Sequence, residues 1–335
     1  MKIAFFDTKP YDREVFNEVN KNFKFDITYF RYHLTKDNAV LAQGFDVAIV
    51  FVNDIISKEI IEKLYNGGIR LIALRSAGFN NIDLKAALGK IRVVRVPAYS
   101  PNAVAEHTVA LMLTLNRKIH RAYFRTRDNN FSLDGLLGFD MYNKTAGIIG
   151  TGKIGTALIK ILNGFGMNII AYDLHPKPEL AKDFNFTYVP LDYLFSNSDV
   201  ISLNCPLTKE TEYIINSENI AKMKDGVMLI NTGRGKLIKT KDLIQGLKTG
   251  KIGYAGLDVY EEESDLFFED LSNKVLTDDI LARLLSFNNV IITSHQGFFT
   301  REAIYNIALT TLQNINDFAN GKPLINEICY KCGNN

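Results

Sequence analysis

The sequence predicts an α/β protein made of two doubly wound parallel-sheet domains. Short runs rich in Val, Ile and Leu alternate with helical patterns through both halves of the chain, which is typical of parallel sheets covered by helices. A glycine-rich turn at residues 150–155 separates a strand-like run from a helix-like one near the middle of the chain. The 335 residues are enough for two domains, each with a core of its own.

The composition is that of an ordinary globular protein that works in water. Hydrophobic residues make up 47% and charged residues 23% of the chain, and the formal net charge is only +2. Because Lys and Arg are also spread along the chain, we expect no nucleic-acid partner and no membrane partner. Asp7 interrupts the apolar start before it reaches the length of an export signal, so we expect a cytoplasmic protein.

Cysteine usage predicts neither a disulfide framework nor a metal site. The chain has three cysteines, of which Cys329 and Cys332 form a C-x-x-C pair in a polar tail. A zinc site usually needs four ligands, and this pair has no second pair to complete them. We interpret the spacing as chance or as part of a frayed end, and we expect no bound metal.

The first hundred residues predict a small parallel sheet with helices between its strands. Ser57 and Gly67 are placed to begin and end a helix over residues 57–65. No glycine-rich dinucleotide turn occurs in this part of the chain. The five strands that we expect here are residues 2–7, 25–30, 46–51, 70–75 and 91–96.

A loop of small residues at 76–83 follows the fourth of these strands. Parallel sheets bind ligands at the carboxyl ends of their strands, so the backbone amides of this loop are candidates for holding a carboxylate. The plainer alternative is a strand-to-helix turn capped by Asn81 or Asp83. The local sequence alone favours this alternative.

A long, mostly apolar helix over residues 101–117 marks the boundary between the domains. Pro101 suits its first turn and Ser100 its cap, and the helix can carry the chain into the second domain. The segment that follows, residues 117–142, is basic, aromatic and weakly periodic. In a nearly neutral protein we interpret it as an arm that covers a partner subunit rather than as a nucleic-acid patch.

The second half of the chain predicts a larger sheet of the type that binds nucleotides. After its last strand, a helix over residues 301–320 is expected to return to the first domain. The domains are therefore predicted as 1–100 plus 299–335, and 101–298. The seven expected strands are residues 145–149, 168–172, 187–189, 200–204, 226–231, 254–259 and 289–293.

The glycine turn has the Gly-x-Gly-x-x-Gly spacing of a dinucleotide site. Gly150 allows the tight turn, Gly152 lets the backbone approach a pyrophosphate, and Gly155 lets the helix pack closely on the strand. Free N–H groups at the helix start face the anion. Asp173 ends the next strand, where an acid binds the adenosine ribose hydroxyls, so the sequence predicts NAD rather than NADP.

Polar residues follow three later strands, where a packed core has no use for them. Arg234 lies between two glycines, and its planar guanidinium suits a carboxylate or a polarised carbonyl. Asp258, Glu263 and His295 follow the next two strands, and a His paired with a Glu is a common general acid. These ends are expected to converge, which suits hydride reduction of a ketone. Two alternatives stay open: residues 261–263 as a solvated acidic run, and His295 as a structural histidine.

The order of these motifs resembles the Arg/Glu/His signature of the D-isomer-specific 2-hydroxyacid dehydrogenases, and within that family the D-lactate dehydrogenase branch. The likeness spans nearly the whole chain. Gly233, Cys205 and Gln296 with Gly297 depart from the usual family residues, but none of them removes a charge that the mechanism needs. The matching segments are residues 75–83, 96–107, the glycine turn, 205–208, 231–235, 257–263 and 294–295.

The resemblance implies a flavodoxin-like substrate domain and a Rossmann NAD domain, with an active-site cleft between them. It implies that His295 is the acid and base, that Glu263 tunes its pKa, and that Arg234 binds the substrate carboxylate and polarises the carbonyl. The other implied substrate-binding residues are Ser76, Ala77, Gly78, Tyr99 and Phe298. The implied cofactor-binding residues are Gly150, Gly152, Lys153, Ile154, Gly155, Asp173, Cys205, Pro206, Thr211, Thr232, Gly233 and Asp258.

The activity implied is the reversible, NADH-dependent reduction of a 2-keto acid to a D-2-hydroxy acid, with pyruvate to D-lactate as the first expectation. Family members of this kind are typically homodimers or assemblies of dimers. One alternative is a dehydrogenase for longer or branched 2-keto acids, of the D-2-hydroxyisocaproate type. Another is a dinucleotide-sensing binding protein that resembles the corepressors on this fold.

Overall fold

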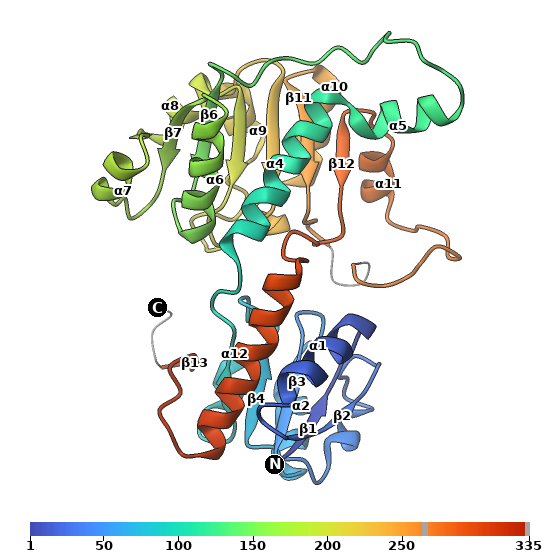
Figure 1. The fold of residues 1–335 in the computed structure, drawn as a ribbon, viewed down its shortest axis with the longest axis vertical. Coiled ribbons are helices and arrows are strands. Elements are labelled where there is room, and N and C mark those ends of the chain that lie inside the picture. Colours follow the sequence, from blue (N-terminus) through green and yellow to red (C-terminus); the bar gives the residue numbers. More distant parts are fainter. Residues whose placement is uncertain (263–266, 332–335) are drawn as a thin grey trace. The chain divides into compact units, whose positions relative to one another are not determined.

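The computed structural model describes residues 1–262 and 267–331. The chain divides into two compact units, which Figure 1 colours along the sequence. The first unit comprises Met1–Ser100 together with Phe299–Asn335, and the second comprises Pro101–Phe298. Glu263 and Cys332, two residues that the sequence marks out, lie outside the described residues.

The sheet of the first unit has six strands in the order β13-β5-β4-β3-β1-β2, and only β13, at one edge, is antiparallel. The five parallel strands follow the 2-1-3-4-5 order of flavodoxin-like domains, which confirms the predicted fold class. The central strands β3 and β4 are buried along their whole length. The strands are β1 (Lys2–Phe5), β2 (Asp26–Tyr29), β3 (Val47–Val50), β4 (Leu71–Leu74), β5 (Arg92–Val94) and β13 (Glu327–Ile328).

Helices cover both faces of this sheet. Alternate residues of a strand point to opposite faces, so Ile3 and Phe5 of β1 belong to one core cluster, whereas Ala4 belongs to the other. The first cluster is covered by α1 (Pro10–Asn20) and α12 (Arg301–Ala319), and the second by η1 (Ala39–Ala42), α2 (Lys58–Asn66) and α3 (Leu84–Ala87).

In the first unit, most residues that the sequence predicts as helix caps lie at the ends of helices. Ser57 and Gly67 occupy the N-cap and C-cap positions of α2. Asp83 caps α3, because its carboxylate accepts a hydrogen bond from the Ala86 N–H at 2.9 Å. The side chain of Asn81 instead donates to the carbonyl oxygens of Phe51 and Asp54, both at 2.8 Å. The 76–83 segment therefore includes the capped turn that the local sequence favours.

Two features of the sheets differ from the prediction. The strand expected at 254–259 is β11 (Ile252–Leu257), two residues earlier. Gly253 takes part in it because its missing side chain admits a close neighbour: a Cβ there would lie 2.4 Å from the Gly226 carbonyl oxygen. Strand β13 was not predicted, since it is two residues long and pairs antiparallel with β5, next to an Arg92–Glu327 ion pair.

The sheet of the second unit has seven parallel strands in the order β12-β11-β10-β9-β6-β7-β8. The chain runs outward from β6 to β8 and then returns to β9 on the other side, so the order reverses between β6 and β9. This reversal is the switch point at which doubly wound sheets bind dinucleotides. The strands are β6 (Thr145–Ile149), β7 (Asn168–Tyr172), β8 (Thr187–Tyr188), β9 (Val200–Leu203), β10 (Val227–Asn231), β11 and β12 (Val290–Ile292).

The second unit also has helices on both faces of its sheet. On one face, α4 (Pro101–Arg117) and α6 (Lys153–Gly164) share a core cluster with β6, and α7 (Pro178–Asp183) packs at its margin. The other face is covered by α8 (Leu191–Asn197), α9 (Ser217–Lys222), α10 (Thr240–Thr249) and α11 (Asp279–Leu285). The short η2 (Gly235–Leu237) follows β10.

Most of the segment after α4 has little contact with the core of its own unit, and only its end, at Phe139 and Met141, packs against that core. Helix α5 (Ile119–Arg127) has no buried residue, although its sequence is partly aromatic. Large apolar side chains remain exposed over the whole arm: Ile119, Tyr123, Phe124, Phe131, Leu133, Leu137 and Tyr142. Among the described residues, no helix combines the length and the apolar character needed to span a membrane.

Candidate active site

The three glycines of the 150–155 turn each have the geometry that the dinucleotide motif requires. Gly150 has a φ of +96°, and a Cβ there would lie 2.7 Å from the Cys205 nitrogen of the neighbouring strand end. A Cβ at Gly155 would lie 2.0 Å from the Gly150 carbonyl oxygen, so α6 can approach the turn only with glycine at this position. A Cβ at Gly152 would meet open space, and the backbone there is accessible to a pyrophosphate.

Asp173 follows β7 and is joined to the glycine turn. Its carboxylate accepts hydrogen bonds from the N–H and the hydroxyl of Thr151, at 2.6 and 2.9 Å, and from the His175 N–H at 2.9 Å. Partial burial raises the pKa of Asp173, but these hydrogen bonds outweigh it and hold the pKa below its usual value. An ionised acid therefore stands at the carboxyl end of β7, beside the turn.

The other side of the switch point is formed by the residues after β9. The Cys205 thiol is largely buried, which raises its pKa to about 11, so it is neutral and not a nucleophile near neutral pH. Thr211 is buried, and its hydroxyl donates to the Pro206 carbonyl at 2.6 Å and accepts from the Thr208 N–H at 2.8 Å. Thr211 thus holds the shape of the 205–208 turn.

Arg234 lies in a short turn after β10 that a buried side chain braces. The Asn231 amide donates to the Arg234 carbonyl at 2.9 Å and accepts from the Gly233 N–H at 3.0 Å. A Cβ at Gly235 would lie 1.9 Å from the Tyr260 carbonyl oxygen, so the turn also depends on glycine. Arg234 is half-buried, and its guanidinium donates to the Gly233 carbonyl at 2.7 Å. Thr232 is buried, and its hydroxyl bonds that of Thr108 at 2.9 Å.

Asp258 and His295 are brought together by main-chain and side-chain hydrogen bonds. The His295 N–H donates to the Asp258 carbonyl at 2.7 Å, while the N–H groups of Gln296 and Gly297 donate to the Asp258 carboxylate, both at 2.8 Å. His295 has a φ of +54°, a left-handed conformation that is uncommon outside glycine and is found at functional sites. Its ring lies 5.9 Å from that of Phe268, which in turn contacts Phe298.

The Asp258 carboxylate is buried and receives four donors. Besides the two N–H groups, it accepts from the Thr293 hydroxyl at 2.6 Å and lies 3.2 Å from His107 Nε2. Burial raises the pKa of Asp258, but the hydrogen bonds and charge of its partners His107, Thr293 and Gly297 together lower it by more. The net shift of the pKa is therefore downward. The aspartate is therefore charged at neutral pH.

The acidic run after β11 is not a solvated stretch throughout. Glu261 is half-buried and accepts hydrogen bonds from the Tyr213 hydroxyl and from both the N–H and the hydroxyl of Thr240. Glu262 is exposed, and Glu263 lies outside the described residues. The solvated-run alternative is thus wrong for Glu261, which has a structural role.

In the first unit, the loop after β4 is held to the rest of the sheet edge. The Ser76 hydroxyl donates to the Gly78 carbonyl at 2.9 Å, and Arg95 donates to the Ala77 carbonyl at 2.9 Å. Ala77, Gly78 and Tyr99 are half-buried. The candidate carboxylate loop is therefore an ordered turn at the carboxyl end of a parallel strand.

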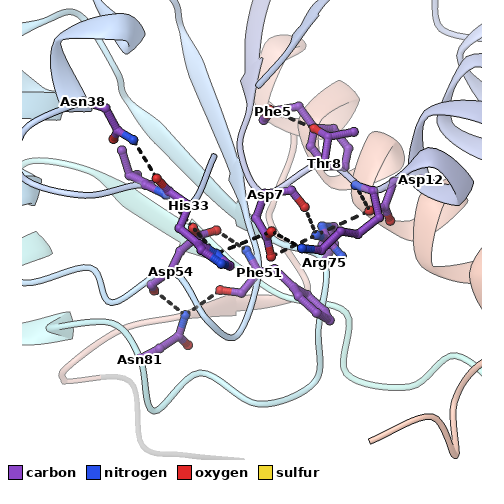
Figure 2. A network of polar contacts seen from close by, with 12 residues as sticks. Phe5, Asp7, Thr8, Asp12, His33, Asn38, Phe51, Asp54, Arg75 and Asn81 are labelled. Carbon is purple, nitrogen blue, oxygen red and sulfur yellow. Dashed lines mark hydrogen bonds and ion pairs between the residues drawn. The ribbon is translucent and has the colours of Figure 1, made fainter. Parts of the chain in front are cut away.

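A buried polar network lies at the same edge and was not predicted from the sequence (Figure 2). Arg75 donates to the Asp7 carbonyl at 2.7 Å, lies 3.4 Å from an Asp12 carboxylate oxygen, and stacks 3.8 Å from the centre of the Phe51 ring. Asp54 accepts from the N–H groups of Leu34 and Phe51, both at 2.7 Å. The only local signal is that Asp7, Asp54 and Arg75 each directly follow or closely follow a buried strand.

His107 is a second residue near the site that was not predicted from the sequence. It lies on α4, the long helix that begins at Pro101. In the structure its Nε2 lies 3.1 Å from the Thr293 hydroxyl and 3.2 Å from the Asp258 carboxylate. The only local signal is a short polar run, Glu106 to Thr108, on a mostly apolar helix.

Comparison with known proteins identifies the family. Residues 109–297 match the family model described as the NAD binding domain of D-isomer specific 2-hydroxyacid dehydrogenases. The chain belongs to this family. The switch point between β6 and β9, with its open Gly152, lies within the matched NAD-binding domain, and NAD(H) is the cofactor of the enzyme.

Individual relatives match over almost the full length of this dehydrogenase. The D-lactate dehydrogenase of Escherichia coli is 52% identical over 330 residues, which are 98% of this chain and 100% of the relative. A 2-hydroxyacid dehydrogenase homolog of Haemophilus influenzae is 55% identical over 324 residues, 96% of this chain and 97% of the relative. The solved structure described as the pyruvate reductase of Chlamydomonas reinhardtii has a TM-score of 0.93 at 44% identity and covers 97% of this chain and 98% of its own. The predicted family, D-lactate dehydrogenase branch and NAD dependence are thus confirmed.

Proposed function

We propose that this enzyme reduces pyruvate to D-lactate with NADH, reversibly. The assignment of the reacting groups is supported chiefly by backbone hydrogen bonds that connect neighbouring strand ends. The Asp258 N–H bonds the Asn231 carbonyl at 2.9 Å, and the His295 N–H bonds the Asp258 carbonyl, so the ends of β10, β11 and β12 are joined in series. The names of the relatives from E. coli and C. reinhardtii support pyruvate as the substrate.

His295 is the proposed acid and base. NADH, when bound, supplies a hydride to the carbonyl carbon, and the carbonyl oxygen then needs one proton. An imidazolium at His295 can donate that proton and recover it when the hydroxy acid is oxidised. The left-handed backbone of His295, bonded on its N–H side, fixes where its side chain leaves the turn. Glu263 is the proposed carboxylate that tunes the pKa of His295, an assignment that rests on the family resemblance.

Arg234 is the proposed partner of the substrate carboxylate and carbonyl. Its guanidinium can offer two parallel N–H groups to a carboxylate once the bond to the Gly233 carbonyl is released. The amides of the 76–78 loop, with Tyr99, are proposed to hold the carboxylate, and Phe298 to shape the side-chain pocket. Support for Phe298 comes from its contact with Phe268, whose ring also lies beside His295.

The proposed cofactor contacts follow from the switch point of the second unit. The glycine turn and the start of α6, with Lys153 and Ile154, are assigned to the pyrophosphate, because N–H groups at a helix start bind anions. Asp173, ionised and beside the turn, is assigned to the adenosine ribose. The remaining assignments, to the rest of the dinucleotide, are Cys205, Pro206, Thr211, Thr232, Gly233 and Asp258.

The exposed arm supports a further part of the proposal, that the enzyme is a homodimer or an assembly of dimers. Helix α5 buries none of its residues within its own chain, and the arm exposes seven large apolar side chains. Exposed apolar surface of this extent is typical of protein–protein contacts. We also propose that the enzyme works in the cytoplasm, in fermentation.

The decisive experiment is NADH oxidation by the purified enzyme with pyruvate, followed by chiral analysis of the product. D-lactate as the product is the expected result and confirms substrate and handedness together. A panel of longer and branched 2-keto acids is assayed in parallel, and a higher kcat/KM for one of them would replace pyruvate by that substrate.

The same assay tests the proposed acid. His295→Ala is expected to lower kcat by about 10²- to 10⁴-fold, the usual contribution of a general acid, and to leave NADH affinity nearly unchanged. The chain contains no tryptophan, so the rise in NADH fluorescence on binding can be read directly. Turnover close to that of the wild type would remove His295 from the proposed role.

A further inference from the structure

Three consecutive N–H groups of the segment that carries His295 donate hydrogen bonds to Asp258. The N–H of His295 donates to its carbonyl, and those of Gln296 and Gly297 donate to its carboxylate. Successive N–H groups around a left-handed residue form a concave anion site, and here the anion is the side chain of Asp258. The orientation of this carboxylate therefore sets the backbone on which His295 stands.

His107 reaches the same carboxylate from a different element of the second unit. It lies on α4, 186 positions before Thr293, and its imidazole is only 17% exposed. Its Nε2 faces the Asp258 carboxylate at 3.2 Å and the Thr293 hydroxyl at 3.1 Å. The Thr293 hydroxyl donates its own hydrogen to Asp258, and a carboxylate can only accept, so the proton must be on His107 Nε2.

Packing around Gly297 fixes the distance between α4 and the His295 segment. A Cβ at Gly297 would lie 2.9 Å from the Asp258 carboxylate and 3.4 Å from His107 Cδ2. Because Gly297 has no Cβ, the carboxylate and the imidazole can both pack against the segment at this position. A larger residue at this position would push the carboxylate away from the donors that it serves.

We infer that His107 is a positioning residue for the reaction: it donates from Nε2 to Asp258, orients the carboxylate, and so holds the 293–297 segment with His295 in its working conformation. The inference rests on the proposed role of His295. His107 itself does not exchange a proton with the substrate. Losing its hydrogen bond leaves the carboxylate free to turn, while Asp258 keeps its charge and its other donors.

The test compares His107→Leu, which fills similar space without a donor, with His107→Gln, whose amide keeps an N–H within reach. We expect His107→Leu to lower kcat by about 10-fold or more, the effect of one hydrogen bond to a charged group. NADH affinity is expected to stay within about twofold, and the isotope effect on kcat with 4-deuterated NADH to rise, because the chemical step becomes slower. His107→Gln is expected to recover most of the rate.

A matched control and a measurement independent of turnover keep the outcome clear. His120→Leu removes another partly buried histidine, on α5, and is expected to leave kcat and the isotope effect unchanged. Hydrogen exchange of residues 293–298 is expected to become faster in His107→Leu and not in His120→Leu. Exchange that stays at the wild-type rate, or a loss of kcat that Gln does not recover, would overturn the inference. If His295→Ala keeps its activity while exchange still quickens in His107→Leu, the proposed acid is wrong but the positioning contact is not.

Discussion

Each unit has a buried aspartate just beyond the end of a parallel strand, and the pKa values of the two aspartates are shifted in opposite directions. In the first unit, Asp54 is 0% exposed and accepts two backbone N–H groups, yet its pKa is raised to about 6, chiefly by burial. In the second unit, Asp258 is 1% exposed, and its pKa is lowered. The two side chains are equally hidden from water, so burial alone does not decide the charge.

The difference lies in how many donors and which charges each carboxylate meets. Asp258 receives two N–H groups, a hydroxyl and an imidazole N–H. Asp54 receives only two N–H groups, and the carboxylate of Asp7 raises its pKa further while the Arg75 guanidinium lowers it. Four donors offset the cost of removing the charge from water, and two do not. Asp258, the aspartate whose pKa is lowered, is the one that binds the segment with the proposed catalytic histidine.

The largest effect is expected from Asp258→Asn. An amide has one acceptor oxygen in place of two, so at least one buried donor from Thr293, Gln296 or Gly297 loses its partner. We expect the free energy of unfolding to fall by about 3 kcal/mol at pH 7, because buried donors lose a charged acceptor, and kcat to fall with it. Urea denaturation measures the first and NADH oxidation the second.

The pH dependence of this variant sharpens the comparison. Because the pKa of Asp258 is lowered in the folded state, its contribution to stability is present above about pH 4 and is lost as the pH falls further. The difference between wild type and Asp258→Asn is therefore expected to shrink below pH 4. Asp225→Asn, at a side chain that is 89% exposed, is the matched control and should change stability by less than about 0.5 kcal/mol.

A smaller effect with the opposite pH dependence is expected from Asp54→Asn. At pH 7.5 the variant loses one of two hydrogen-bond acceptors but also a buried charge, and we expect a net loss of about 1 kcal/mol. The folded pKa of about 6 lies above the usual 3.8, so the wild type gains stability as the pH falls from 6 to 4. Urea unfolding at pH 5 should therefore show a gap about 1 kcal/mol wider than at pH 7.5. A gap that narrows toward pH 5 would mean that the pKa of Asp54 is not raised.

Elements whose cause lies in a few neighbouring residues could be predicted from the sequence. Gly150 and Gly155 were interpreted correctly because a positive φ and a backbone contact exclude every other side chain. Strands β6 and β7 have the predicted bounds, since their apolar runs end in glycine and in Asp173. The doubly wound fold class followed from the alternation of strands and helices and from the place of the glycine turn.

The polar partners across the fold could not be predicted in the same way. Arg75 bonds Asp7 over 68 positions, and His107 meets Thr293 over 186, so no local spacing relates them. A histidine on a mostly apolar helix is more often structural than functional, so the sequence alone did not mark His107 as part of the site. What these pairs have in common is position: each joins the end of a parallel strand to another element, and that is visible only once the sheet order is known.

The smallest effect is expected from Glu261→Gln, a third carboxylate in the comparison. Burial raises the pKa of Glu261, but bonds from the Tyr213 hydroxyl and from Thr240 outweigh it and lower the pKa, as at Asp258. Glu261 is only partly buried, and water can replace a lost partner, so we expect a loss of about 0.5 to 1 kcal/mol by urea unfolding and a kcat within about twofold of wild type. A large fall in kcat would show that Glu261, and not only Glu263, contributes to catalysis. An unchanged kcat would separate its structural member, Glu261, from the member that is proposed to tune His295.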